Sequence, residues 1–136
     1  MEEKNKLLLV DDDTSALMEL IGILKDDYEI STAKSAFAAI ERARTFEPDL
    51  ILLDVVMPEM SGFDAIESLQ QLASTRDIPV VFVSGADDNS DERKGLELGA
   101  IDYIRKPYDE VIIKLRVKHH ISMINKLRKA NLSGGF

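Results

Sequence analysis

Short runs of apolar residues recur along the chain, and a polar segment with helically spaced apolar residues follows each of them. Each run is five or six residues long, and most are rich in Val, Ile and Leu, which is typical of β-strands. We predict five strands, at residues 6–10, 28–32, 49–54, 79–84 and 102–106.

The intervening segments predict helices. After the first run, Leu17, Leu20, Ile21 and Leu24 fall at i, i+3, i+4 and i+7, one face of a helix. Ser35 is positioned to cap a second helix. The other helical faces are Ala36, Ala39, Ile40 and Ala43 in the second helix and Ala65, Ile66, Leu69 and Leu72 in the third, which follows a turn at "PEMSG".

Two further helices are expected in the last third of the chain. The fourth, at about 90–98, carries Gly95 inside it and Gly99 at its end, so its intrinsic stability is low. The fifth begins near Asp109 and runs to about Arg128. Residues 129–136 are expected to form a flexible tail after a domain of residues 1–128.

Strands rich in Val, Ile and Leu that alternate with helices indicate a parallel sheet buried on both faces. We therefore predict an α/β fold, a doubly wound five-stranded parallel sheet. The flavodoxin-like strand order 2-1-3-4-5 suits five strands best.

Composition narrows the class of protein. The 136 residues, 45% of them hydrophobic, suit one domain, and the lack of cysteine excludes disulfides and thiolate zinc sites. A net charge of -8 disfavours non-specific binding to nucleic acid or to anionic membranes, and without a helix-turn-helix, zinc-finger or RNA-binding signature we expect no direct binding to nucleic acid. The charged start "MEEKNK" precedes only four apolar residues, too few for a signal peptide, so we expect a soluble, cytoplasmic protein.

Polar residues follow the predicted strands at one edge of the sheet. These residues are Asp11 and Asp12, Asp54, Ser84 and Lys106. Ligands of open α/β sheets bind at the carboxyl ends of the strands. Three crowded carboxylates either raise each other's pKa or recruit a cation, and Mg²⁺ is the natural choice because it prefers oxygen ligands.

With a phosphate on the metal, this set of groups predicts phosphoryl transfer. Lys106 would supply a point charge and Ser84 a donor. Asp54 is the expected nucleophile because it ends the most apolar strand and is followed by a loop. Any one of these residues alone would usually be a cap or loop residue, and it is their coincidence at one edge that favours a site.

These residues resemble the receiver domain of two-component response regulators over residues 6–125. The matching pieces are "LLLVDDD", "PDLILLDVVMPEMSGFD", "VVFVSG" and "GAIDYIRKP", in the family's order and spacing. The resemblance implies that Asp54 accepts a phosphoryl group from the phosphohistidine of a sensor histidine kinase or phosphotransfer protein. It also implies Mg²⁺ bound directly by Asp12 and Asp54, through water by Asp11, and by the Val56 backbone carbonyl.

The resemblance further implies a switch. Ser84 and Lys106 would contact the phosphoryl oxygens, and Tyr103 would turn inward when Ser84 moves toward the phosphate. The surface formed by the fourth helix, the fifth strand and the fifth helix would then change and could bind a target or a second copy.

Two departures from the common receiver pattern affect expectations. Gly85 stands where alanine is frequent, which would loosen the coupling between Ser84 and Tyr103. Val56 and Ala86 offer no group to position an attacking water, so we expect slow loss of the phosphoryl group.

The last helix has two interpretations. Ile113, Val117, His120, Ile124 and Leu127 are spaced like a coiled-coil seam, which would dimerise or lead into an output domain. Alternatively, Ile113 and Val117 pack on the sheet and the rest is a solvated, basic helix end. His119 and His120 are expected to be surface residues.

Two rival functions remain open at this point. "LVDDDTS" loosely resembles the haloacid dehalogenase phosphatases, with Asp11 as nucleophile and Asp13 as acid, but that assignment leaves Asp54 without a role. The other rival is a receiver-like adaptor that binds its partner without phosphorylation.

Overall fold

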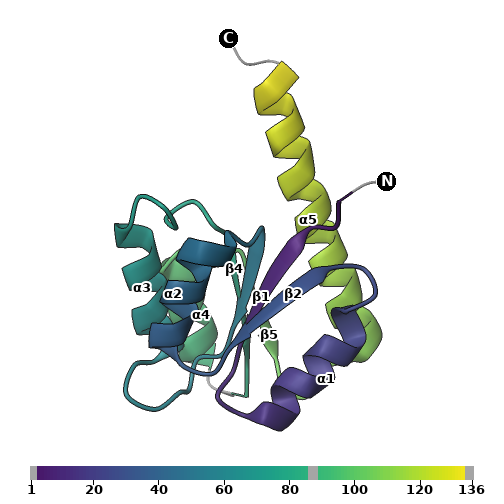
Figure 1. Cartoon of the computed structure of the whole chain (residues 1–136). Helices are drawn as coiled ribbons and strands as arrows, with labels where there is room; N and C mark the ends of the chain where they lie inside the picture. Colours follow the sequence, from purple (N-terminus) through teal and green to yellow (C-terminus); the bar gives the residue numbers. More distant parts are fainter. Residues whose placement is uncertain (1–2, 86–88, 134–136) are drawn as a thin grey trace.

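Five parallel strands form one sheet at the centre of the molecule (Figure 1). The structure is a computed structural model that describes residues 3–85 and 89–133. The strands are β1 (Lys6–Val10), β2 (Glu29–Ala33), β3 (Leu50–Leu53), β4 (Val80–Ser84) and β5 (Asp102–Arg105). Their order is β2-β1-β3-β4-β5, which confirms the predicted topology.

The register of neighbouring strands decides which side chains meet at the carboxyl edge. Val10 lies opposite Leu53, so the next residue on each strand, Asp11 and Asp54, emerges at the same level. The Asp54 backbone N–H donates to the Val10 carbonyl at 3.0 Å, which extends the strand pairing by one residue. The acidic residues are therefore placed by the strand pairing itself.

Five helices connect and cover the strands. They are α1 (Thr14–Leu24), α2 (Ala36–Phe46), α3 (Gly62–Gln71), α4 (Asn89–Glu97) and α5 (Glu110–Ser133). The predicted cap at Ser35 is confirmed, because its side chain accepts from the Ala38 N–H. Ser61 and Asp64 form a reciprocal capping box at the start of α3.

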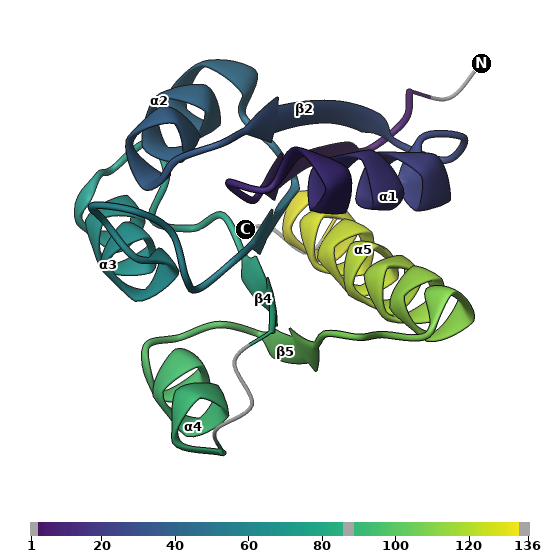
Figure 2. The same ribbon diagram turned by 90° about the horizontal axis from the view of Figure 1, so that it is seen from below.

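The helices cover the two faces of the sheet unequally. α1 and α5 lie on one face and α2, α3 and α4 on the other, as Figure 2 shows. Alternate residues of β1 serve the two cores: Leu7 and Leu9 pack with α1 and α5, whereas Leu8 and Val10 pack with α2 and α3.

α5 is longer than the sequence predicted. It continues to Ser133 instead of ending near Arg128, so residues 129–133 of the expected flexible tail are helical, and residues 134–136 lie outside the described part of the chain. Lys129, Ala130 and Asn131 contain no helix breaker, and the first glycine comes only at 134.

The face of α5 that packs on the sheet is now defined. Ile113 and Val117 are fully buried, which confirms the interpretation that they pack on the sheet. The buried stripe continues at Ile121 and not at His120, while Leu127 is 61% exposed. The last part of α5 extends beyond the sheet (Figure 1).

A polar cluster ties this extending part of α5 to the start of the sheet. Arg128 Nη1 donates to Asp49 Oδ1 at 2.5 Å, and the Asn5 and Asn125 side-chain amides donate to each other at 3.0 and 3.2 Å. Asp49 Oδ2 also accepts from the Lys6 backbone N–H at 2.7 Å. We call Asn5, Asp49, Asn125 and Arg128 the α5 clamp.

Among the described residues, none of the helices combines the length and apolar character that crossing a membrane would require.

Candidate functional site

Three carboxylates converge where β1 and β3 end. Asp11, Asp12 and Asp54 each place one carboxylate oxygen within 4.8 Å of the others. Asp11 and Asp54 are buried, whereas Asp12 is exposed. This is the cluster that the sequence predicted, and its donor set of carboxylate oxygens suits a hard divalent cation.

Local backbone contacts orient the two buried carboxylates. Asp11 Oδ1 accepts from the Asp13 N–H, and Asp54 Oδ1 accepts from the Val55 N–H, each at 2.9 Å. Asp13 itself caps α1 by accepting from the Ser15 N–H. Asp11 and Asp54 are thus held in place before any ligand binds.

A glycine allows the loop after Asp54 to fold back onto it. The Gly62 N–H donates to the Val55 carbonyl at 2.8 Å, and a Cβ at position 62 would lie 2.1 Å from the Asp54 carbonyl oxygen. Only a residue without a side chain fits this approach. The sequence predicted Gly62 only as the last residue of the turn at "PEMSG" and did not reveal this role, because the contact depends on tertiary structure.

Lys106 and Ser84 complete the site. Lys106 Nζ lies 2.6 Å from Asp11 Oδ2, and the Lys106 backbone N–H donates to the Ser84 carbonyl at 2.9 Å. Ser84 is fully buried at the end of β4. The structure therefore brings together five of the predicted site residues: Asp11, Asp12, Asp54, Ser84 and Lys106.

The surroundings of Asp54 disfavour its charged form. Burial raises the pKa of the Asp54 carboxyl to about 6, and the neighbouring Asp11 carboxylate adds to the rise. The Lys106 ammonium and the hydrogen bonds from Ser84 and the Val55 N–H oppose it. A cation at this cluster would relieve the repulsion between Asp54 and Asp11.

Tyr103 lies inside the protein. It is 4% exposed, and its ring packs against Phe82 with centroids 6.0 Å apart. Its hydroxyl has no hydrogen-bond partner among the described residues. Burial is the main reason why the pKa of the Tyr103 phenol is raised. The nearby Ser84 hydroxyl acts in the opposite direction, although it is not placed to form a hydrogen bond with the phenol.

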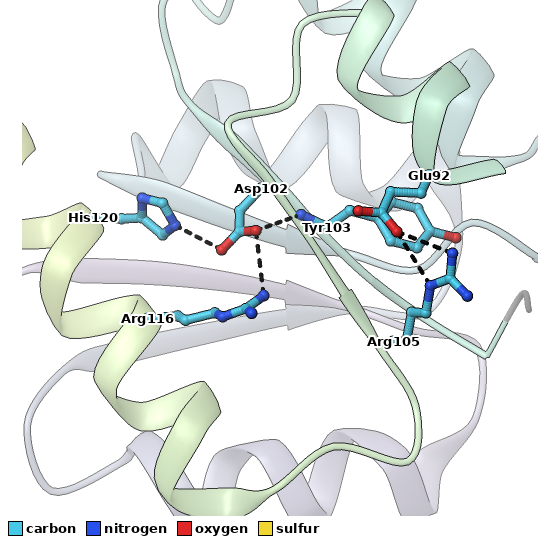
Figure 3. A network of polar contacts seen from close by, with 6 residues as sticks. All are labelled: Glu92, Asp102, Tyr103, Arg105, Arg116 and His120. Carbon is cyan, nitrogen blue, oxygen red and sulfur yellow. Dashed lines mark hydrogen bonds and ion pairs between the residues drawn. The ribbon is translucent and has the colours of Figure 1, made fainter. Parts of the chain in front are cut away.

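Polar contacts on either side of Tyr103 fasten both flanking helices to β5 (Figure 3). Asp102 bonds to His120 at 3.0 Å and to Arg116 at 3.4 Å, both on α5. Arg105 pairs with Glu92 of α4 at 3.0 Å. The expectation that His120 is a surface residue is wrong in part, because it is half-buried against Asp102, whereas His119 is exposed.

The roles expected of two residues beside the site, Val56 and Ala86, remain predictions. The Val56 side chain is 67% exposed just beyond Asp54, and its backbone carbonyl remains a predicted metal ligand. Ala86 lies outside the described residues.

Comparison with known proteins identifies the family. The family model for the response regulator receiver domain matches residues 7–118. The chain belongs to this receiver family. Receivers of this family are in general signalling switches in two-component systems and not catalysts with turnover.

Curated relatives include receivers in longer and in short proteins. The chain is 39% identical over 115 residues to a probable cyclic di-GMP phosphodiesterase of Vibrio cholerae and 39% over 132 residues to response regulator PleD of Caulobacter vibrioides. These matches cover 85% and 93% of this chain but only 26% and 29% of those relatives. The chain is also 36% identical to protein PilH of Pseudomonas aeruginosa, covering 77% of this chain and 88% of PilH.

Solved receiver structures share the fold. A CheY-like receiver domain protein from Methanospirillum hungatei superposes with a TM-score of 0.83 at 26% identity, covering 91% of this chain and 98% of that one. The receiver domain of a histidine kinase from Syntrophus aciditrophicus gives 0.79 at 32% identity, covering 87% and 90%.

These findings decide between the receiver and the phosphatase alternative. The receiver match spans Asp54, which had no role in a haloacid dehalogenase-like site and here lies in the acidic cluster. Asp13, the acid of that alternative, is engaged as the cap of α1. The residues therefore fit a receiver and not a haloacid dehalogenase phosphatase.

Proposed function

We propose that Asp54 is the phosphoacceptor of this receiver and takes a phosphoryl group from the phosphohistidine of a sensor histidine kinase or phosphotransfer protein in the cytoplasm. The observation that carries the proposal is the position of Asp54. It is a buried carboxylate, oriented by the Val55 N–H, with Asp11, Asp12 and Lys106 around it.

In the proposed reaction, a carboxylate oxygen of Asp54 forms a bond to phosphorus while the nitrogen–phosphorus bond of the phosphohistidine breaks. The electron pair of the broken bond stays on the imidazole, and the product on Asp54 is an acyl phosphate. Lys106 and Ser84 stabilise the transferring oxygens as a point charge and a hydroxyl donor.

The acidic cluster is the proposed Mg²⁺ site. Asp12 and Asp54 would bind the ion directly together with the Val56 carbonyl, and Asp11 would bind through water. Both oxygens of Asp11 already have partners, the Asp13 N–H and Lys106, which supports its indirect role. A bound Mg²⁺ would neutralise charge on the carboxylates and on the phosphoryl oxygens.

The proposed output is a change of the face formed by α4, β5 and α5. Tyr103 on β5 would follow Ser84, and the contacts of Asp102 and Arg105 lie beside it. Exposed apolar residues of these elements, Leu96 in α4, Ile101 just before β5 and Met123 in α5, would be available to a protein target or a second copy. A second copy could instead pair through the extended α5. Direct nucleic-acid or membrane binding is not part of the proposal.

Incubation with Mg²⁺ and acetyl phosphate, followed by intact mass measurement, tests the proposal. The parent should gain about 80 Da, the mass of one phosphoryl group on a carboxylate, and the gain should be absent with EDTA and in Asp54→Asn. No gain in the parent would favour the phosphorylation-independent adaptor. A gain in Asp54→Asn as well would place the acceptor among Asp11, Asp12 and Asp13.

The same sample tests the expected slow loss of the phosphoryl group. After removal of acetyl phosphate, the added mass should persist well beyond seconds because Val56 has no polar group to position water. Loss within seconds would show that another residue activates water.

A further inference from the structure

Gly95, the third residue from the end of α4, lies directly against two aromatic rings. A Cβ built at this position would be 2.9 Å from Cδ2 and 3.1 Å from Cε2 of Phe82, and 3.2 Å from Cδ2 of Tyr103. The first of these distances is shorter than real Cβ contacts. α4 can therefore sit this close to β4 and β5 only because residue 95 has no side chain.

A glycine at position 95 weakens α4, so its presence there calls for a structural reason. Glycine inside a helix destabilises it relative to alanine, because its backbone loses more conformational freedom on folding. Gly22 in α1 carries the same cost, but a Cβ there would meet nothing within 4 Å. Both glycines lie inside a helix. Only Gly95 is packed against other side chains, those of Phe82 and Tyr103.

The rings beneath Gly95 form a row across this face of the sheet. Phe63 packs edge-on against Phe82 at 5.4 Å, Phe82 packs against Tyr103, and Lys94 of α4 lies 4.9 Å over the Phe63 ring. α4 therefore packs directly on this row of rings. Tyr103 belongs to β5, the edge strand, so its ring lies at the end of the row with α4 against it and no further strand of the described chain beyond.

Within the described part of the chain, ring packing and not a hydrogen bond to the hydroxyl holds Tyr103 inward. Its hydroxyl is buried without a hydrogen-bond partner among the described residues, and an unsatisfied buried hydroxyl costs free energy. Among residues 3–85 and 89–133, no hydrogen bond to the hydroxyl offsets a loss of ring contacts. A small change in the space above the ring should therefore move the tyrosine outward.

We propose that Gly95 is a positioning residue for phosphorylation: its missing side chain lets α4 close over the inward Tyr103 ring, and so sets how readily the phosphorylated state forms. This inference rests on the proposed function, in which the inward ring accompanies phosphorylation of Asp54. Coupling between two sites is reciprocal, so a substitution that disfavours the inward ring must weaken binding of a phosphoryl group or its analogue.

Gly95→Ala tests the proposal. The chain has three tyrosines, so replacing them with 3-fluorotyrosine gives few ¹⁹F resonances, and Tyr103→Phe assigns the one of interest. In Gly95→Ala we expect the Tyr103 resonance to become solvent-exposed. We also expect the beryllofluoride concentration for half-saturation, with Mg²⁺ present, to rise at least about fivefold, the lower end of usual coupling.

Two controls separate positioning from a general effect on the fold. Gly22→Ala makes the same chemical change in an open helix position and should leave both measurements unchanged. Adding Phe82→Leu to Gly95→Ala makes room for the new methyl group, and relative to Phe82→Leu alone should restore the beryllofluoride response.

Each outcome has a defined meaning. If Gly95→Ala keeps Tyr103 buried and binds beryllofluoride like the parent, the proposal is overturned, even if the stability of the protein changes. If the parent itself binds no beryllofluoride, the proposed phosphoacceptor function fails. If the Phe82→Leu background does not restore binding, the positioning role through these rings is also rejected.

Discussion

At the scale of single residues, Asp54 combines two demands that conflict. In its proposed role, burial holds Asp54 rigidly, yet the same burial disfavours the charge that would make it a nucleophile. The raised pKa of Asp54, caused mainly by burial and then by Asp11, measures this conflict. Its ionised side chain therefore destabilises the folded state in the absence of a cation.

Asp54→Asn should stabilise the metal-free protein at pH 7. The pKa of Asp54 is about 6 in the folded state against 3.8 for a free aspartate, so folding binds the proton more tightly and stability falls as pH rises between these values. The variant escapes this loss, worth ~3 kcal/mol from the pKa difference. Urea denaturation with EDTA should show the gain at pH 7 and not near pH 3.5.

Asp26→Asn is a suitable control for this measurement because Asp26 is exposed and remote from the cluster in sequence. It should change stability little at either pH. Equal stability of Asp54→Asn and the parent at pH 7 would show that the ionised Asp54 carboxylate does not destabilise the folded protein.

Gly62→Ala should damage both the fold and the site. The added Cβ would meet the Asp54 carbonyl oxygen at 2.1 Å, so the loop must move away from the residue that it positions. We expect a loss of about 3 kcal/mol in unfolding free energy, the upper end for overpacking, and slower labelling by acetyl phosphate. Gly85→Ala, also next to the site but with nothing within 4 Å, should retain the parent's stability.

At the scale of elements, the sequence predicted the strands and the acidic edge well because those features depend on local patterns. Apolar runs gave the five strands to within a residue or two, and the strand ends gave Asp11, Asp54, Ser84 and Lys106. What could not be predicted depends on contacts between distant segments. Gly62 against Asp54 and Gly95 against Phe82 are examples, since a glycine's surroundings leave no trace in its neighbours along the chain.

The last helix also combines features that local sequence predicted with features that depend on contacts between distant segments. Its spacing of apolar residues admitted two faces, and only packing against the sheet selected Ile113, Val117 and Ile121. His120 was assigned to the seam because it falls at the right spacing, although in the structure it bonds to Asp102. The α5 clamp was also missed, because it joins Asn5 and Asp49 to residues about 80 to 120 positions away.

Removing the α5 clamp should loosen the end of α5. In the double variant Asn125→Ala/Arg128→Gln, the helix beyond Ile121 loses its side-chain bonds to Asn5 and Asp49. We expect amide hydrogen exchange in residues 122–133 to accelerate at least about fivefold, because the lost bonds include one between charged groups. Lys126→Gln, an exposed change in the same helix, should leave exchange as in the parent.

At the scale of the whole molecule, negative charge is concentrated at one edge of a protein that already carries a net charge of -8. A divalent cation bound there should stabilise the folded chain because the unfolded chain has no such cluster. At a Mg²⁺ concentration 100 times Kd, the expected gain is about 2.7 kcal/mol.

Thermal unfolding with and without Mg²⁺ measures this gain. The melting temperature of the parent should rise by several degrees, whereas Asp54→Asn and Asp12→Asn should respond much less. NaCl at matched ionic strength controls for simple screening of the net charge. A similar rise with NaCl would mean that the cluster does not bind the ion specifically.

The length of α5 limits how a charge placed on Asp54 can influence the far end of the molecule. The helix begins after β5, at the acidic edge, and ends past the opposite edge of the sheet (Figure 1). Its 24 residues span about 36 Å, several times the screening length of about 8 Å in physiological salt. Screening therefore weakens the electric field of a phosphoryl group along the solvated part of α5, and a response at Ser133 would be transmitted mainly through the helix itself. A helix of this length acts as a lever: a tilt of about 5° near its first turn displaces its tip by about 3 Å.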